Sequence, residues 1–194
     1  MINEIIKDFE FVKEIDKMKN VIRKVKNINN DNYEDDAQHT FHIAIMSTVL
    51  YKYIEIELDL KKVIEMLLFH DLVEIYAGDT FAYDNEAYKT KKIREELAAN
   101  KIFGIMSEDN NKKFRSYFEE FEDMKTNEAL YANFIDRIQP MLLNHYNNGG
   151  TWKLHNIKKE QVKNRIEFAK DKFPKLYSHM INLIDETYLD NNLC

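Results

Sequence analysis

The 194-residue sequence contains few of the residues that cross-link or interrupt a chain: one cysteine, two prolines and four glycines. Because Cys194 is the only cysteine, no disulfide can form within the chain, and we expect a cytoplasmic protein in which Cys194 has no role. No window approaches about 18 uninterrupted apolar residues, so we expect no membrane span. The charged N-terminus does not resemble a signal peptide.

Charge of one sign is also not concentrated anywhere in the sequence. The formal net charge is −6, and no run of lysine and arginine stands out. A nucleic-acid backbone or an anionic membrane surface is therefore not the expected partner. A small anionic substrate is compatible with this composition, because a local site can be positive on an acidic protein.

The apolar residues repeat every three or four positions through most of the chain, which is the period of amphipathic helices. We therefore predict an all-α protein that is more than about 60 % helical and has no sheet. At this length we expect a compact single-domain helical bundle over residues 1–194. The expected helices cover about residues 1–26, 37–53, 61–77, 86–103, 108–124, 127–147, 158–172 and 174–189. Residues 27–36 are rich in Asn and Asp and predict a loop.

The stretch Leu67–Thr80 begins as an apolar run and then places three ionisable residues, His70, Asp71 and Glu74, close together. A helix that is buried on most sides rarely carries such groups, because a buried charge is costly unless it is paired or bound to a metal. His70 and Asp71 lie about 100° apart on a helix, and Glu74 lies one turn beyond His70. The alternative is that His70 is a core or capping histidine with satisfied hydrogen bonds.

Four residues are candidates for one mononuclear metal site: His39, His70, Asp71 and Asp136. Two imidazoles and two carboxylates suit a divalent first-row metal with positions left open for water. These residues fall on three different expected helices, so only tertiary folding can bring them together. His42 is expected in a packing or surface role. The other histidines lie in polar or helix-end surroundings and are expected to be solvated: His145, His155 and His179.

Asp136 stands within an apolar helical pattern and therefore needs a buried partner. That partner is either a metal ion or the neighbouring Arg137. The aromatic residues Phe81, Tyr83 and Trp152 can stack on a base or pack in the core, and the sequence does not choose between these roles.

Several segments resemble the HD-domain metal-dependent phosphohydrolases, and in particular the subfamily of the bacterial 5′-deoxynucleotidases and their HD-domain-containing relatives. The matching segments are Glu14–Arg23, Asp36–His39, the central stretch through Asp84, Asp136–Asn144 and Gly149–Trp152. The resemblance implies an HD-type helical domain with its metal-binding core at about residues 20–147 and C-terminal helices at about 158–190. It also implies a homodimer that hydrolyses (deoxy)nucleoside 5′-monophosphates.

The resemblance assigns roles to individual residues. It implies one divalent metal ion (Mn, Co, Fe, Ni, Zn or Mg) at the positions matching His39, His70, Asp71 and Asp136. It also implies catalytic roles for Glu74 and Asp79, and a phosphate contact for Arg23, whose alternative role is that of a cation near a helix end. A carboxylate at Glu74 can take a proton from water, and Asp79 can orient water or protonate the leaving oxygen.

Two positions depart from the subfamily pattern. Gln38 stands where relatives have Glu, and Lys24 stands where the bacterial enzyme has a Trp that helps to sense the sugar. The second departure leaves the sugar preference open, because the residue that helps to sense the sugar differs here.

There are alternatives to this function, both within the same superfamily and outside enzymes. Guanosine-tetraphosphate hydrolases of the same superfamily carry His-Asp-x-x-Glu-Asp, whereas Ile75 follows Glu74 here, and the Gly-Tyr-Pro of the cyclic-dinucleotide branch is absent. A non-catalytic, metal-containing regulatory or binding module is the alternative from another class. The presence of Glu74, Asp79 and Arg23 around the expected ligands favours the enzyme.

Overall fold

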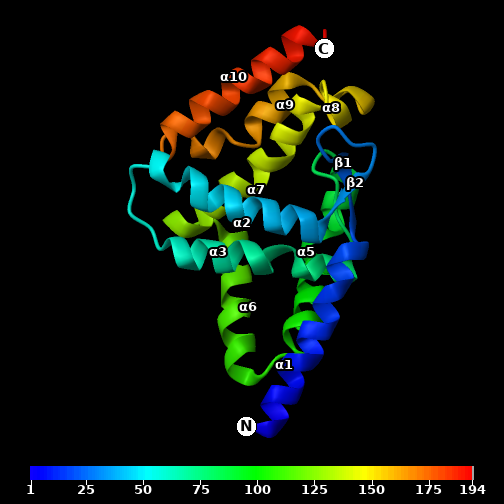
Figure 1. The fold of residues 1–194 in the computed structure, drawn as a ribbon, viewed down its shortest axis with the longest axis vertical. Coiled ribbons are helices and arrows are strands. Elements are labelled where there is room, and N and C mark those ends of the chain that lie inside the picture. The colour runs from blue at the N-terminus through cyan, green and yellow to red at the C-terminus, as the bar shows by residue number, and fades with distance from the viewer. Residues whose placement is uncertain (194) are drawn as a thin grey trace.

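The computed structural model describes residues 1–193, and Cys194, for which we expect no role, lies outside the described residues. The helices are α1 (Ile2–Glu14), α2 (Asp36–Leu50), α3 (Leu60–Phe69), α4 (Glu74–Ala77), α5 (Asn85–Phe103), α6 (Glu108–Asp123), α7 (Asn127–Tyr146), α8 (Gly150–Leu154), α9 (Lys159–Asn164) and α10 (Pro174–Asp190). Helices α2 and α3 cross the middle of the molecule, α5 and α6 extend towards the N-terminal end, and α8–α10 form the opposite end (Figure 1).

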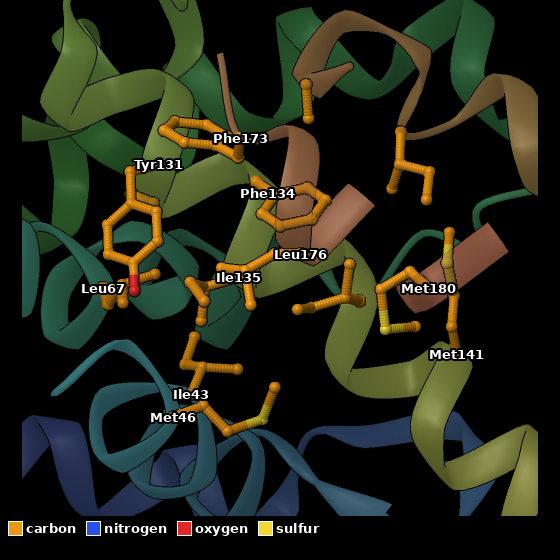
Figure 2. Close-up of a cluster of buried hydrophobic side chains, with 14 of the residues drawn as sticks. Ile43, Met46, Leu67, Tyr131, Phe134, Ile135, Met141, Phe173, Leu176 and Met180 are labelled. Atoms are coloured by element: carbon orange, nitrogen blue, oxygen red, sulfur yellow. The ribbon is translucent and has the colours of Figure 1, made fainter. Parts of the chain in front are cut away.

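Helix α7 is the central element of the larger hydrophobic core. Tyr131, Phe134 and Ile135 on α7 are completely buried, and they pack against side chains of α2, α3 and the C-terminal helices (Figure 2). The ring of Phe173, which precedes α10, lies 5.4 Å from that of Tyr131. This core ties the C-terminal helices to the two helices that cross the middle of the molecule.

A second, smaller core joins α1 to α5 and α6 through residues such as Phe11, Met18 and Phe103. Polar contacts reinforce it at the start of α6. One carboxylate oxygen of Asp8 accepts a hydrogen bond from the backbone N–H of Ser107 at 2.8 Å. The other accepts from the Ser107 hydroxyl and from the Asn110 amide, each at 2.9 Å. Asp8 therefore supplies acceptors for the free backbone donors of α6 from outside that helix.

The prediction of an all-α bundle is confirmed, since 73 % of the chain is helical. The expected single helix over residues 1–26 is wrong. Helix α1 ends at Glu14, a 3₁₀ segment covers Ile15–Asn20, and the chain then forms a strand, β1 (Ile22–Lys26). Strand β1 pairs in antiparallel fashion with β2 (Tyr33–Asp35), so the expectation of no sheet is also wrong. The expected loop over residues 27–36 is present at residues 27–32, but β2 and the start of α2 replace its end.

The physical reason for this strand lies in the local sequence. In β1 the side chains alternate between exposed positions and the half-buried Arg23 or the buried Val25. This period of two is that of a strand, and a segment as short as Ile22–Lys26 fits it as well as it fits a helical period. Apolar residues of α1 that fitted the continuous helical pattern, including Ile5 and Phe9, are instead exposed.

The expected central helix over residues 61–77 is interrupted. Helix α3 ends at Phe69, a 3₁₀ turn covers His70–Val73, and α4 follows. Each residue of this tighter turn advances by about 120° rather than 100°. Gly78 ends α4 with φ +74° and ψ 149°, a conformation that favours glycine. The helix expected over residues 158–172 is likewise shorter, because α9 ends at Asn164 and a 3₁₀ turn covers Glu167–Ala169.

The apolar stripe that predicted α2 faces away from the core. Phe41, Ile45, Val49 and Tyr53 are 69 %, 51 %, 57 % and 45 % exposed. Another side of α2, which includes His39 and Ile43, is buried. No helix among residues 1–193 combines the length and the apolar character needed to cross a membrane.

Candidate metal centre and active site

Four side chains from three parts of the fold meet at the centre of the molecule. His39 lies on α2, His70 and Asp71 on the 3₁₀ turn after α3, and Asp136 near the middle of α7. One donor atom from each residue lies within 4.8 Å of those of the others. His39 Nε2 is 3.0 Å from Asp136 Oδ1, and His70 Nε2 is 3.1 Å from Asp71 Oδ1. The residues expected to meet on folding therefore do so.

Hydrogen bonds on the far side of each imidazole fix its orientation. His70 Nδ1 donates to the carbonyl of Leu67 at 2.8 Å, and His39 Nδ1 lies 3.0 Å from Oε1 of Gln139. Both Nε2 atoms therefore point into the cluster, as in metal sites whose histidines are oriented by an outer partner. The amide of Gln139 donates in turn to Glu34 at 2.6 Å. Neither Gln139 nor Glu34 was predicted to have a role. Gln139 lies in the matching segment Asp136–Asn144, about one helical turn after Asp136, and this was a signal for it.

The electrostatics of the cluster favour positive charge between the donors. Burial alone would lower the pKa of His70, but the carboxylates of Asp71 and Asp136 raise it to about 10. Burial would likewise raise the pKa of Asp136, but its hydrogen bond with His39 and the neighbouring imidazole of His70, 3.7 Å away, bring it well below its usual range. His70 Nε2 is buried and has no hydrogen-bond partner among the described residues. The donor set therefore fits a divalent metal ion, which this His/Asp cluster can hold.

Arg23 lies on strand β1 rather than at a helix end, and it extends into a group of carboxylates. Its Nη1 donates to Asp36 at 3.0 Å and to Asp71 at 3.1 Å, and its Nε is 3.4 Å from Glu34 Oε2. The Arg23 side chain is only 13 % exposed. Arg23 therefore neutralises buried carboxylates as well as lining the central cavity. The contribution of Asp36 was missed, because nothing in its local sequence distinguishes it from other acidic residues at helix starts.

Glu74 lies beside the four-residue cluster and is 6 % exposed. Its carboxylate, that of Asp36 and that of Asp71 lie within 4.8 Å of one another. Burial, followed by the charges of Asp71 and Asp36, raises the pKa of Glu74 well above its usual value. Burial also raises the pKa of Asp79, which lines the same cavity. Carboxylates with raised pKa values are suited to moving protons near neutral pH.

A cavity of about 940 Å³, its open mouth included, is lined by three residues of the cluster, His70, Asp71 and Asp136, and His39 is buried behind them. Tyr83 and Phe81 lie in its wall, with their rings 5.4 Å apart. Trp152 is 2 % exposed and stacks on Tyr188 at 5.7 Å, so it packs mainly in the core. Arg137 is not the partner of Asp136; it donates to the Arg165 carbonyl and to Asn133 instead.

The remaining histidines lie outside the cluster. His42 is half-buried, with Nδ1 3.1 Å from the Gln139 amide, whereas His155 and His179 are exposed. The expectation that His145 is solvated is wrong: it is half-buried and bonds to the Thr187 hydroxyl at 2.7 Å, because α10 packs against this end of α7.

The fold and the cluster agree with a known family. The model of the HD domain family matches residues 15–177, most of the chain. The chain belongs to the HD domain family.

Part of the chain is also similar in sequence to individual relatives. The 5′-deoxynucleotidase HDDC2 of Dictyostelium discoideum is 32 % identical over 114 residues, which cover 56 % of this chain and 60 % of the relative. The human HDDC2 is 28 % identical over 109 residues, covering 56 % and 52 %. The chain thus matches a little over half the length of these relatives.

Solved structures match nearly the whole chain. The crystal structure of a predicted metal-dependent phosphohydrolase from Magnetospirillum magnetotacticum has a TM-score of 0.89 and 34 % identity, with 98 % of both chains covered. A conserved hypothetical protein from Pyrococcus furiosus has a TM-score of 0.65 and 18 % identity, covering 90 % of this chain and 99 % of its own, and it agrees in fold alone.

Proposed function

We propose that this protein is a metal-dependent phosphohydrolase that releases phosphate from (deoxy)nucleoside 5′-monophosphates. The observation that carries the proposal is the position of Glu74, Asp79 and Arg23 in one cavity with the four-residue His/Asp cluster. The names of the HDDC2 relatives and of the Magnetospirillum protein support the same reaction.

In this proposal His39, His70, Asp71 and Asp136 hold one divalent metal ion. When bound there, such an ion neutralises the charge of the phosphate and lowers the pKa of bound water towards about 7. Arg23 contributes a planar set of donors that matches phosphate oxygens. Its contacts with Asp36 and Asp71 hold the guanidinium beside the cluster.

Glu74 accepts the proton of the attacking water in this mechanism. It lies within reach of the cluster through its neighbour Asp71, and the positive charge of an ion held there would favour the ionised carboxylate that takes the proton. Asp79, one residue after the turn at Gly78, orients water or returns a proton to the leaving oxygen. Burial of the whole group strengthens each of these interactions, because water screens them less.

We further propose that residues 1–194 act as one domain in a cytoplasmic homodimer, with a small nucleotide as substrate. The exposed apolar stripe Phe41, Ile45, Val49 and Tyr53 on α2 supports a contact with a second copy, since large exposed apolar stripes mark interaction surfaces. Sedimentation analysis of the protein and of Ile45→Glu tests this. The variant is expected to be monomeric, and a monomeric parent protein would refute the dimer.

The central experiment compares Asp136→Ala with Glu74→Gln, measuring metal content and phosphate release on the same preparations. Asp136→Ala removes a charged ligand, so metal content, activity and thermal stability should all fall. Glu74→Gln keeps the side-chain volume, so metal content should remain while turnover falls by about 10²–10⁴-fold. Glu160→Gln, an exposed residue outside the cavity, is the matched control. Loss of metal in Glu74→Gln would make Glu74 a ligand, and full activity in both variants would refute the hydrolase.

A further inference from the structure

Two arginines line the same cavity as the His/Asp cluster but have no part in the mechanism above. Arg137 lies on α7, directly after Asp136, and Arg165 follows the end of α9. Consecutive residues of a helix point about 100° apart. Helix α7 therefore directs Asp136 towards the cluster and Arg137 towards the C-terminal helices.

The guanidinium of Arg137 contacts the backbone of Arg165, and aromatic rings lie near both guanidinium groups. Arg137 Nη1 donates to the backbone carbonyl of Arg165 at 2.9 Å, and its guanidinium lies 4.8 Å from the ring of Phe168. Arg165 makes a long hydrogen bond of 3.3 Å to the carbonyl of Ala82, and its guanidinium lies 5.7 Å from the ring centre of Tyr83. Most of the five N–H donors of Arg165 thus have no partner among the described residues.

Neither guanidinium has an acidic partner. No carboxylate oxygen of residues 1–193 lies within 4.0 Å of Arg137 or Arg165. The other buried cations of the cavity are paired: Arg23 with Asp36 and Asp71, and Lys91 with Glu95 at 3.2 Å. Burial, and then the positive charge of Arg165, lower the pKa of Arg137. The fold therefore keeps two like charges, neither of them paired with a described carboxylate, on the half-buried wall of one cavity, an arrangement that an anion would stabilise.

We propose that Arg137 and Arg165 form a second anion subsite, and that the substrate carries a second phosphate besides the one that is hydrolysed. This inference rests on the proposed phosphohydrolase function, and a nucleoside 3′,5′-bisphosphate is a molecule of this class. A guanidinium matches phosphate oxygens with two parallel hydrogen bonds. Because the subsite and the cluster share one cavity, a single molecule can reach both.

The test measures binding by calorimetry in a Glu74→Gln background, where turnover is slow. The probes are adenosine 5′-monophosphate and adenosine 3′,5′-bisphosphate. We expect the bisphosphate to bind more tightly than the monophosphate. Arg165→Gln should weaken bisphosphate binding by about 10–100-fold and change monophosphate binding by less than about 3-fold. Arg165→Lys, which keeps the charge but loses the planar fork, should give an intermediate loss.

Two controls separate this effect from general damage. Lys170→Gln removes an equal charge from an exposed position among the C-terminal residues, outside the cavity, and should leave both affinities unchanged. Thermal unfolding of every variant reports on the fold. If Arg165→Gln does not fold, Arg165→Lys carries the comparison.

The subsite is refuted if the parent protein binds both nucleotides equally well, or if Arg165→Gln weakens both by the same factor. The second result would instead assign Arg165 to the nucleoside or to the fold. Failure of the proposed function looks different: no phosphate is released from any nucleotide, while calorimetry still reports preferential, Arg165-dependent binding of the bisphosphate.

Discussion

His39 and Gln139 lie 100 residues apart in the chain and meet through Nδ1 and Oε1 at 3.0 Å. Gln139 is completely buried, and its amide continues the contact to Glu34. One hydrogen-bonded chain therefore links β2, α2 and α7 behind the proposed metal ligands. The orientation of His39 depends on this chain, because an imidazole can turn about its own side-chain bonds when its outer nitrogen has no partner.

Replacing Gln139 by Leu should lower metal affinity by about 10–100-fold, because the outer partner that orients His39 is lost. Competition with a fluorescent chelator measures this affinity directly. Thr187→Val, which removes a buried hydroxyl group outside the cluster, is the control for general destabilisation. An unchanged metal affinity in Gln139→Leu would show that His39 is oriented by other contacts.

Removing Arg23 should affect stability as well as substrate binding. Arg23→Gln leaves buried carboxylates of Asp36 and Asp71 without their counter-charge, which should cost about 3–5 kcal/mol of unfolding free energy. Adding Asp36→Asn should restore part of that stability, because one uncompensated charge is removed. Phosphate binding should remain weak in both variants. Urea denaturation and phosphate titration measure the two effects, and a double variant less stable than Arg23→Gln would contradict this account.

The contact between Asp8 and the start of α6 should make stability depend on pH. The backbone N–H of Ser107, together with its hydroxyl and the Asn110 amide, lowers the pKa of Asp8. A lowered pKa in the folded state stabilises the protein above the unfolded pKa of about 3.9, and this contribution is lost as the pH falls through the folded value.

Asp8→Asn should therefore lower Tm at pH 6–7, and the difference from the parent protein should shrink as the pH falls below about 3.9 and through the lowered pKa of Asp8 in the folded protein. Differential scanning calorimetry across this range checks the expectation. Asp171→Asn, at an exposed position with no ion pair among the described residues, is the matched control. A difference in Tm that is constant with pH would mean that the charge of Asp8 is not involved.

Phe173 should contribute strongly to the packing of the C-terminal helices against α7. Its ring is 1 % exposed and packs against Tyr131 and Phe134 of α7 at 5.4 and 5.5 Å. Phe173→Ala should lower the free energy of unfolding by about 3–5 kcal/mol, through lost burial and the cavity left behind. Phe9→Ala, at a 71 % exposed position, should change it by less than about 0.5 kcal/mol. Equal effects in the two variants would place Phe173 outside the cooperative core.

Helical periodicity was sufficient to predict the fold class, because most of the chain has one buried side repeated every three or four residues. The helical period gave a wrong prediction where a short segment fits both the period of a helix and that of a strand. Ile22–Lys26 is short enough to fit a helix or a strand, and only the pairing with Tyr33–Asp35 decides between them. Periodicity also does not reveal which side of a helix packs against the core. The spacing of Phe41 and Ile45 correctly predicted helix α2, although both side chains face away from the core.

The candidate site was predictable as far as residue types with unusual chemistry occur in apolar surroundings, as His70 and Asp136 do. Glu34, Asp36 and Gln139 could not be found in this way, since their roles come from contacts across the fold. Gln139 bonds to Glu34 across 105 residues, and Arg23 bonds to Asp36 across 13. A local sequence pattern cannot reveal contacts between residues that lie so far apart in the sequence. The same holds for Arg165, whose sequence neighbourhood resembles any amphipathic helix.

The wide spacing of the four-residue cluster has a consequence for how the protein is made. His39 and Asp136 are 97 residues apart, and Asp136 comes last. At a translation rate of about 5–20 residues per second, a nascent chain that already contains His39 waits about 5–20 s for Asp136 to be added. During that interval α7, the helix around which the larger core packs, is also incomplete. The donor set is therefore complete once α7 has been added, whereas the larger core, which also includes residues of α9 and α10, is complete only later.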